Sequence, residues 1–223
     1  MRTRNIFILF TMLALHLSAC TDIEDGTTDI DSWPAINEYT LAHPCMLHTA
    51  ADLSYVASKL TVAPWSEGYD KLKNSGYSYA GYVPTPQEVL GRMDQGNWAS
   101  KFPEWWNNYT YFYKDAAAAY QLALRWKLEG DVACGQTAVK ILNAWAETCK
   151  GLVRVKSLAN DRTYDANGEI ADPNEYLISI NVHQMANAAE IMRTDETLFT
   201  KAQLSAFQTM MKNVFYPAAS DFL

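Results

Sequence analysis

Helical periodicity is the sequence feature that most constrains this chain, because strand signals are nearly absent from it. From Ala138 to Cys149, apolar residues recur at alternating spacings of three and one, which is typical of a helix with one apolar face. The stretch 116–124 is instead apolar around most of a helical circumference, and a helix of that kind is buried. These patterns predict an all-α fold in which a buried helix over 113–129 pairs with an amphipathic helix that ends near Cys149.

Capping signals mark two helices before this pair. Thr49 followed by Asp52 is typical of an N-cap and predicts a helix that reaches Leu60. Pro64 suits the first turn of a second helix, where its missing N–H costs nothing.

Two further helices are expected after the pair. A helix over 178–193 carries an apolar stripe, and Thr200 with Gln203 forms a capping box for a last helix that ends near Pro217. Paired helices of buried and amphipathic type are what two concentric layers require, so the expected architecture is an incomplete α/α toroid (α/α barrel) of antiparallel helical hairpins. A helical solenoid would show a similar pattern, but we find no sequence repeat that supports one.

The remaining stretches are expected to be connections. Residues 75–86 are rich in Gly, Pro and aromatic residues and predict a packed loop, with a short helix expected from Pro86. The polar segment 152–173 is long for a connection and is either a functional loop or a tolerated surface insertion.

The N-terminus has the layout of an export signal. Arg2 and Arg4 precede an apolar run over 6–17 that is too short to span a bilayer. Small residues then lead to Cys20, the position that a lipoprotein signal peptidase requires for acylation, although an ordinary signal peptide with a chance cysteine there is the alternative. Acyl chains on Cys20 would hold the protein at a membrane surface. We expect an exported, membrane-anchored lipoprotein, either periplasmic or on the outer-membrane surface.

Three segments of different character result from this interpretation. Residues 1–19 form the lipoprotein signal peptide, and residues 20–40 form a lipidated tether that is acidic and poor in apolar residues. Residues 41–223, about 180 residues, are enough for one helical domain with a sizeable core.

Charge and motifs exclude several functions. The net charge is -7 with no basic cluster, which argues against nucleic acid as a partner. A polyanionic sugar would also need local positive charge. Gly-rich phosphate loops, GxSxG, HExxH and paired metal spacings are absent from the sequence, so neither a cofactor nor a metal is predicted. Cys45, Cys134 and Cys149 match neither a zinc site nor a redox pair, and most simply they are small apolar groups.

Three histidines of the expected domain are candidates for chemistry. Spacings of four and three place His183, Asn187 and Glu190 on one helical face. His183 could act as a base or bind sugar hydroxyls, or it could be a core histidine bonded to Glu190 or a carbonyl. His43 and His48, just before the first helix, could take part in catalysis or satisfy loop and cap hydrogen bonds.

Aromatic residues crowd into 98–113 with adjoining amides and lysines. Aromatic faces stack on pyranose rings, and amides bind hydroxyls and carboxylates, so the run is a candidate carbohydrate platform with Trp106 and Asn108 as preferred contacts. The alternative is that the cluster belongs to the core.

Several segments, taken together and in this order, resemble the alginate lyase family of α/α toroid polysaccharide lyases. They are HPCMLHTAADLSYVASKL (43–60) with APWSEGYDKL (63–72), KDAAAAYQLALRWKLEGD (114–131) with AVKILNAWA (138–146), and NVHQMANAAEIMR (181–193) with FYPAASDFL (215–223).

The resemblance implies β-elimination on a uronate-containing, alginate-like polysaccharide. In this chemistry Asn, His or Arg neutralises the substrate carboxylate, His or Tyr removes the C5 proton, and Tyr protonates the leaving oxygen. The candidate positions are His183 for catalysis and Trp106, Asn108 and Arg193 for substrate binding, with an anionic polysaccharide or oligosaccharide as the partner.

The family's Asn-His pair and catalytic Tyr usually come after a segment like 215–223, where this sequence stops. The chain is therefore expected to be either truncated, and then inactive for want of the full catalytic set, or naturally short, a glycan-binding surface lipoprotein that does not cleave. Truncation is favoured because Leu204, Phe207 and Phe215 form an apolar face with no later partner helix in the sequence.

Overall fold

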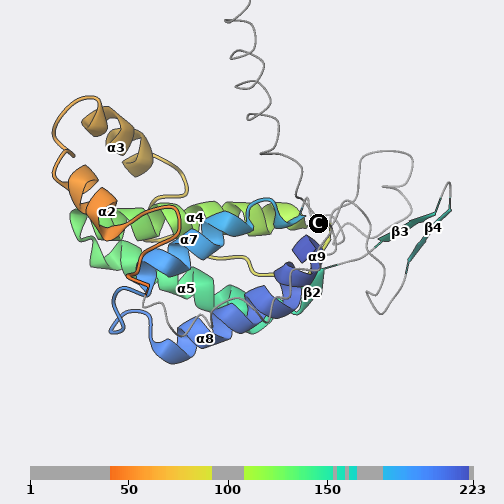
Figure 1. Ribbon diagram of the computed structural model, residues 1–223. Helices are drawn as coiled ribbons and strands as arrows, with labels where there is room; N and C mark the ends of the chain where they lie inside the picture. The colour runs from red at the N-terminus through yellow and green to blue at the C-terminus, as the bar shows by residue number, and fades with distance from the viewer. Residues whose placement is uncertain (1–40, 92–107, 153–154, 159–160, 165–177, 221–223) are drawn as a thin grey trace, which may run out of the picture. The chain divides into compact units, whose positions relative to one another are not determined.

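The computed structural model describes residues 41–91, 108–152, 155–158, 161–164 and 178–220 (Figure 1). Contacts divide the chain into two units, Met1–Leu41 and Ala42–Leu223, and every described helix belongs to the second unit. The predicted signal peptide, Cys20 and the tether lie outside the described residues. None of the described helices combines the length and apolar character needed to cross a membrane.

The described part is mostly helical, as the all-α prediction requires. Its helices are α2 (Ala50–Ala57), α3 (Trp65–Lys73), α4 (Tyr109–Glu129), α5 (Val132–Thr148), α7 (Val182–Met192) and α8 (Lys201–Met210), followed by the π-helical turn η5 (Met211–Phe215) and α9 (Tyr216–Ser220). Short strands pair as β1 (Val89–Leu90) with β2 (Gly151–Leu152), parallel, and β3 (Val155–Leu158) with β4 (Asp161–Tyr164), antiparallel.

The helix ends are set by local sequence. Gly130 has a φ of 77°, the left-handed conformation that closes α4, and the Asp131 side chain accepts a hydrogen bond from the Cys134 amide to cap α5. The N-cap predicted at Thr49 and the capping box predicted at Thr200 are confirmed, and Thr49 with Asp52 also forms a capping box. Only Gly130 and Asp131 connect α4 to α5, and so short a connection forces the two helices into an antiparallel hairpin.

Four helices form two layers. α4 packs against α5 and α7, and α5 also packs against α7 and α8. In Figure 1, α4 and α7 run in one direction above α5 and α8, which run in the other. The fit between α4 and α5 is close, because a Cβ added at Gly135 would lie only 2.8 Å from the Trp126 ring.

Buried side chains of the hairpin hold the segment 75–91 in place. Asp115, fully buried on α4, accepts hydrogen bonds from the Tyr82 hydroxyl, the Thr85 amide and the Trp145 indole, each at 2.7 Å. Arg125 donates to the Ser78 carbonyl at 2.7 Å. The predicted packed loop is thus an ordered segment that crosses the hairpin and ends in β1.

Two local predictions were wrong. No helix begins at Pro86, because residues 89–90 extend and pair with β2, which commits their backbone groups to a strand ladder. The last helix does not end at Pro217 either. The turn η5 interrupts the α-helical ladder, and Pro217 then stands in the first turn of α9, where its missing N–H is tolerated.

The expectation that the last helices lack a partner for their apolar face was also wrong. Phe207 and Phe215 are buried, and the Phe215 ring stacks on Phe112 of α4 with centroids 4.8 Å apart. Leu204 is partly buried against the same core. The argument for truncation drawn from this face therefore fails.

Removal of the Asp115 carboxylate should destabilise the fold. Asp115→Ala leaves three donors without an acceptor, and at about 1–3 kcal/mol for each unsatisfied buried group we expect unfolding to become easier by about 3 kcal/mol or more. Asp115→Asn should cost much less, because its carbonyl can accept from Thr85 and Trp145 while its amide donates to the Tyr82 oxygen.

Urea denaturation measures both variants, with Asp70→Ala on the exposed face of α3 as the matched control. Equal stability of Asp115→Ala and the control would show that the buried carboxylate does not hold segment 75–91.

Candidate functional site

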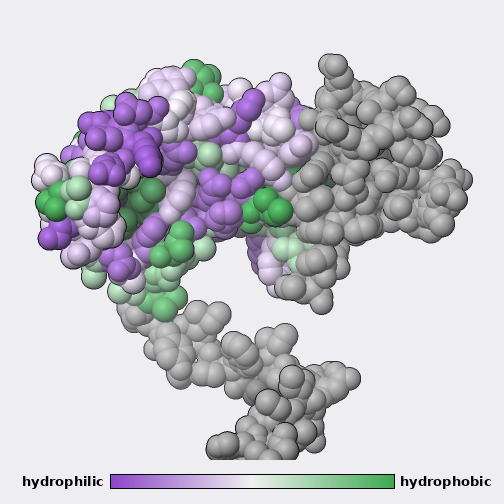
Figure 2. Space-filling model, turned by 90° about the horizontal axis from the view of Figure 1, so that it is seen from above, coloured by the Kyte–Doolittle hydropathy of each residue, from purple (hydrophilic) through white to green (hydrophobic). Residues whose placement is uncertain are grey.

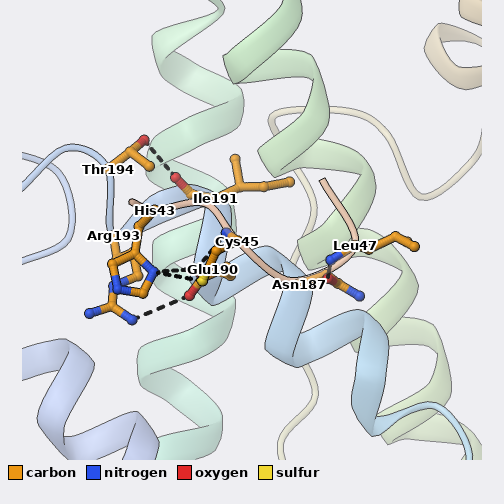
Figure 3. A network of polar contacts seen from close by, with 8 residues as sticks. All are labelled: His43, Cys45, Leu47, Asn187, Glu190, Ile191, Arg193 and Thr194. Carbon is orange, nitrogen blue, oxygen red and sulfur yellow. Dashed lines mark hydrogen bonds and ion pairs between the residues drawn. The ribbon is translucent and has the colours of Figure 1, made fainter. Parts of the chain in front are cut away.

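A short segment before α2 crosses the C-terminal half of α7 (Figure 3). We call residues 42–48 the strap. The Cys45 amide donates to Oε1 of Glu190 at 3.0 Å, and the Leu47 amide donates to Oδ1 of Asn187 at 3.2 Å. Side chains of α7 thus satisfy the strap's backbone, which fixes its path over the helix.

A charged cluster surrounds the Glu190 carboxylate. His43 Nδ1 lies 2.5 Å from Oε1, and Arg193 Nη1 lies 3.3 Å from Oε2. Burial tends to raise the pKa of Glu190, but the hydrogen bonds from His43 and Cys45 outweigh it and the pKa is lowered. Glu190 is therefore an anion at neutral pH although only 7% of its surface is exposed.

The Cys45 thiol belongs to the same cluster. Its sulfur lies 3.4 Å from both His43 Nδ1 and Glu190 Oε1, and it is exposed to solvent. Desolvation, the hydrogen bond to Glu190 and the charge of Glu190 together raise the pKa of the thiol. Cys45 is consequently a protonated thiol that donates to the carboxylate.

A second pair joins the strap to α4. Nε2 of His48 is hydrogen bonded to the Tyr120 hydroxyl, and the two rings are stacked with centroids 5.9 Å apart. Burial lowers the pKa of His48, against the opposing effect of Asp52, and burial raises the pKa of Tyr120. Both groups are therefore neutral at physiological pH, a state in which the imidazole can accept a proton and the phenol can supply one.

His183 stands apart from the cluster. Its ring is exposed, and Nδ1 donates to the Ile180 carbonyl at 2.8 Å, so the second nitrogen, Nε2, is the basic one. The predicted face of α7 exists, since Asn187 donates to the His183 carbonyl at 2.8 Å. The strap, however, engages only Asn187 and Glu190 on this face. Glu190 lies seven positions after His183, which is about 10 Å along the helix axis.

The other predicted substrate contacts are placed as follows. Asn108 is buried at the start of α4, where its Oδ1 accepts from the Gly91 amide at 2.9 Å and its Nδ2 donates to the Val89 carbonyl at 3.0 Å, so its amide holds β1. Trp106 lies outside the described residues. Arg193 is half-buried beside Glu190. Of the aromatic run, Phe112 is in the core and Tyr111 is exposed.

The convergence of His43, Cys45 and Glu190 was not predicted. The sequence pattern connects Glu190 with His183 and Asn187, and it assigns Cys45 to the core. No spacing rule joins positions 145 residues apart, so the only signal in the sequence is the density of reactive residues in His43-Pro44-Cys45.

No family model, no curated protein and no solved structure matches this chain. The function is therefore inferred from the contacts described above.

Replacement of Glu190 should activate the Cys45 thiol. Glu190→Gln removes the negative charge that helps to raise the thiol pKa, so more thiolate forms near neutral pH and alkylation by iodoacetamide becomes severalfold faster. Mass spectrometry of peptides locates the label, and the buried Cys134 and Cys149 should stay unmodified in the folded protein.

Glu196→Gln is the matched control, because Glu196 is an exposed carboxylate just beyond α7. If both variants are alkylated at the wild-type rate, Glu190 does not control the thiol.

Proposed function

We propose that the protein is a polysaccharide lyase of the alginate lyase type that cleaves a uronate-containing polysaccharide by β-elimination. The supporting observation is that residues from separate segments of the resemblance contact one another: the strap, from 43–60, binds Asn187 and Glu190, from 181–193.

The arrangement of the helices supports the finer architecture in the same proposal. An α/α toroid repeats antiparallel hairpins so that successive hairpins contribute to an inner and an outer layer. Helices α4 and α7 pack side by side in one layer and α5 and α8 in the other, with opposite directions (Figure 1). We assign this two-layer unit as part of a toroid.

His183 is the proposed base. Its exposed Nε2 takes the proton from C5 of the uronate, the C–H electron pair becomes the C4=C5 double bond, and the C4–O bond breaks. The departing oxygen takes a proton from a water molecule. A neutralised carboxylate is required to make the C5 proton acidic enough to remove.

Arg193 is the proposed contact for a substrate carboxylate. It lies ten residues beyond His183 on the same helical course, about 15 Å along the axis. The two side chains are too far apart to act on one sugar, so Arg193 would bind a different uronate unit of the same polymer. Figure 2, which views the molecule from above Figure 1, shows hydrophilic and hydrophobic residues mixed over the described part of the surface.

Export and acylation at Cys20 complete the proposal. A lipid anchor would keep the lyase at the cell envelope, where an extracellular polysaccharide is accessible.

A glycan-binding protein without lyase activity is the second candidate, and an aromatic cleft favours it. A cavity of about 260 Å³ is lined by Trp65, Tyr69, Leu72 and Leu128, among others. Tyr55 is exposed beside it and meets Trp65 edge-on, with centroids 5.7 Å apart. Exposed aromatic faces of this kind bind sugar rings without chemistry.

An assay for unsaturated ends separates the two candidates. Protein expressed from its complete reading frame is incubated with alginate and other uronate polymers, and ultraviolet absorbance monitors the C4=C5 product. We expect product from the wild type and a rate about 100-fold lower or worse for His183→Ala, the usual cost of a lost general base.

Gln136→Ala, an exposed position on α5, is the matched control and should keep the wild-type rate. Binding of the polymers without any product would refute the lyase and favour the glycan-binding protein. Product formation at an unchanged rate in His183→Ala would refute the assignment of the base alone.

A further inference from the structure

Three different metal-ligating atoms meet where the strap crosses α7. His43 Nδ1, Cys45 Sγ and Glu190 Oε1 all lie within 4.8 Å of one another. The sulfur is 3.4 Å from the nitrogen and 3.4 Å from the oxygen, and the nitrogen and oxygen are 2.5 Å apart. These distances form a triangle whose size can be compared with the face of a coordination tetrahedron.

Tetrahedral zinc requires nearly this triangle. Bonds of about 2.0–2.3 Å from zinc to nitrogen, oxygen and sulfur place neighbouring ligand atoms about 3.4–3.6 Å apart. Two of the three edges already have that length, and only the His43–Glu190 edge must widen, by about 0.9 Å. Rotation of the half-buried His43 ring can provide this change without displacement of α7.

We propose that His43, Cys45 and Glu190 bind a divalent ion of the zinc class, with a fourth coordination position open to solvent. The ligand set decides the class: a thiolate and an imidazole suit Zn²⁺ and similar ions, whereas Mg²⁺ and Ca²⁺ need oxygen ligands. The proposed lyase base, His183, is not a ligand of this site.

Charge balance supports the assignment. Binding replaces the thiol proton, so that Zn²⁺ and Cys–SH give Zn–S–Cys and one released proton. The thiolate and the Glu190 carboxylate then neutralise the ion. Arg193 stays on Oε2, 3.3 Å away, where it orients the carboxylate and leaves Oε1 to face the ion.

The surroundings allow an ion to enter. Cys45 is exposed and His43 is 28% exposed, whereas Glu190 is buried beneath them. The ion would therefore approach from solvent onto a carboxylate held by α7. The backbone bond from the Cys45 amide keeps the strap positioned beforehand, which reduces the ordering cost of binding.

Binding of cobalt and zinc to the full-length protein tests the proposal. Chelator-treated protein is titrated with Co²⁺, and we expect a thiolate-to-cobalt charge-transfer band in the wild type that Cys45→Ser abolishes. With Zn²⁺, elemental analysis after removal of excess metal should find one equivalent more in the wild type than in Cys45→Ser. Glu190→Gln should lose most of this binding, and its matched control Glu196→Gln should keep it.

Zinc protection of the thiol is a second readout. Zn²⁺ should slow the alkylation of Cys45 in the wild type severalfold, and His183→Ala, an exposed histidine of the same helix, should be protected equally. A wild-type protein without a charge-transfer band, or with Cys45 alkylated at the same rate with and without Zn²⁺, would overturn the metal site.

Discussion

Close packing around α4 is the constraint on which the remaining structure depends. Ala116, Ala118, Ala119 and Ala123 are all buried, and their small side chains let α5 and α7 lie against the same helix. Larger residues at these positions would separate the helices and overpack the core. Because α4 fixes α7, the row from His183 to Glu190 has a fixed position relative to the strap, and the strap in turn brings His48 to Tyr120 on α4.

Asp115 and Glu190 are both buried in this arrangement, but their pKa values are shifted in opposite directions. Burial raises the pKa of Asp115 in spite of its three hydrogen bonds, so the folded state holds its proton more tightly and loses stability as the pH rises above the ordinary value of 3.8. For Glu190 the hydrogen bonds from His43 and Cys45 prevail over burial. The contribution of Glu190 to the stability of the folded state is therefore fully present at pH values above its ordinary pKa of 4.5. It is lost as the pH falls through the lowered pKa of the folded state. The contribution of Glu190 to stability is therefore lost in acid, whereas that of Asp115 falls as the pH rises.

The sequence predicted those parts of the structure that depend on neighbouring residues. The helix caps at Thr49 and Thr200 are local, and the periodicity of α4 and α5 reports directly which faces are buried. Strand pairing at 89–90 was missed because the partner, Gly151–Leu152, is some sixty residues away and two residues carry no period.

The candidate site was predictable only in part, for the same reason. Periodicity placed His183, Asn187 and Glu190 on one face of a helix, but it contains no information on what covers that face. The strap contacts Asn187 and Glu190 and leaves His183 exposed, so one face has two environments. Asn108, chosen as a partner for sugars, has its amide engaged by the backbone of Val89 and Gly91, a contact that only the folded chain defines.

Because the two ends of α7 have different surroundings, the proposed base and the proposed metal site lie apart on the helix. The base proposed for elimination is in the first turn of the helix, and the proposed metal ligand Glu190 is in the last, about 10 Å further along the axis. An ion at Glu190 is therefore too far from His183 to polarise a sugar carboxylate that His183 could reach, and its role would be to fasten the strap to α7. Metal binding requires the Cys45 thiol to lose its proton, so protons compete with the ion, and the ion would fasten the strap near neutral pH and above rather than in acid.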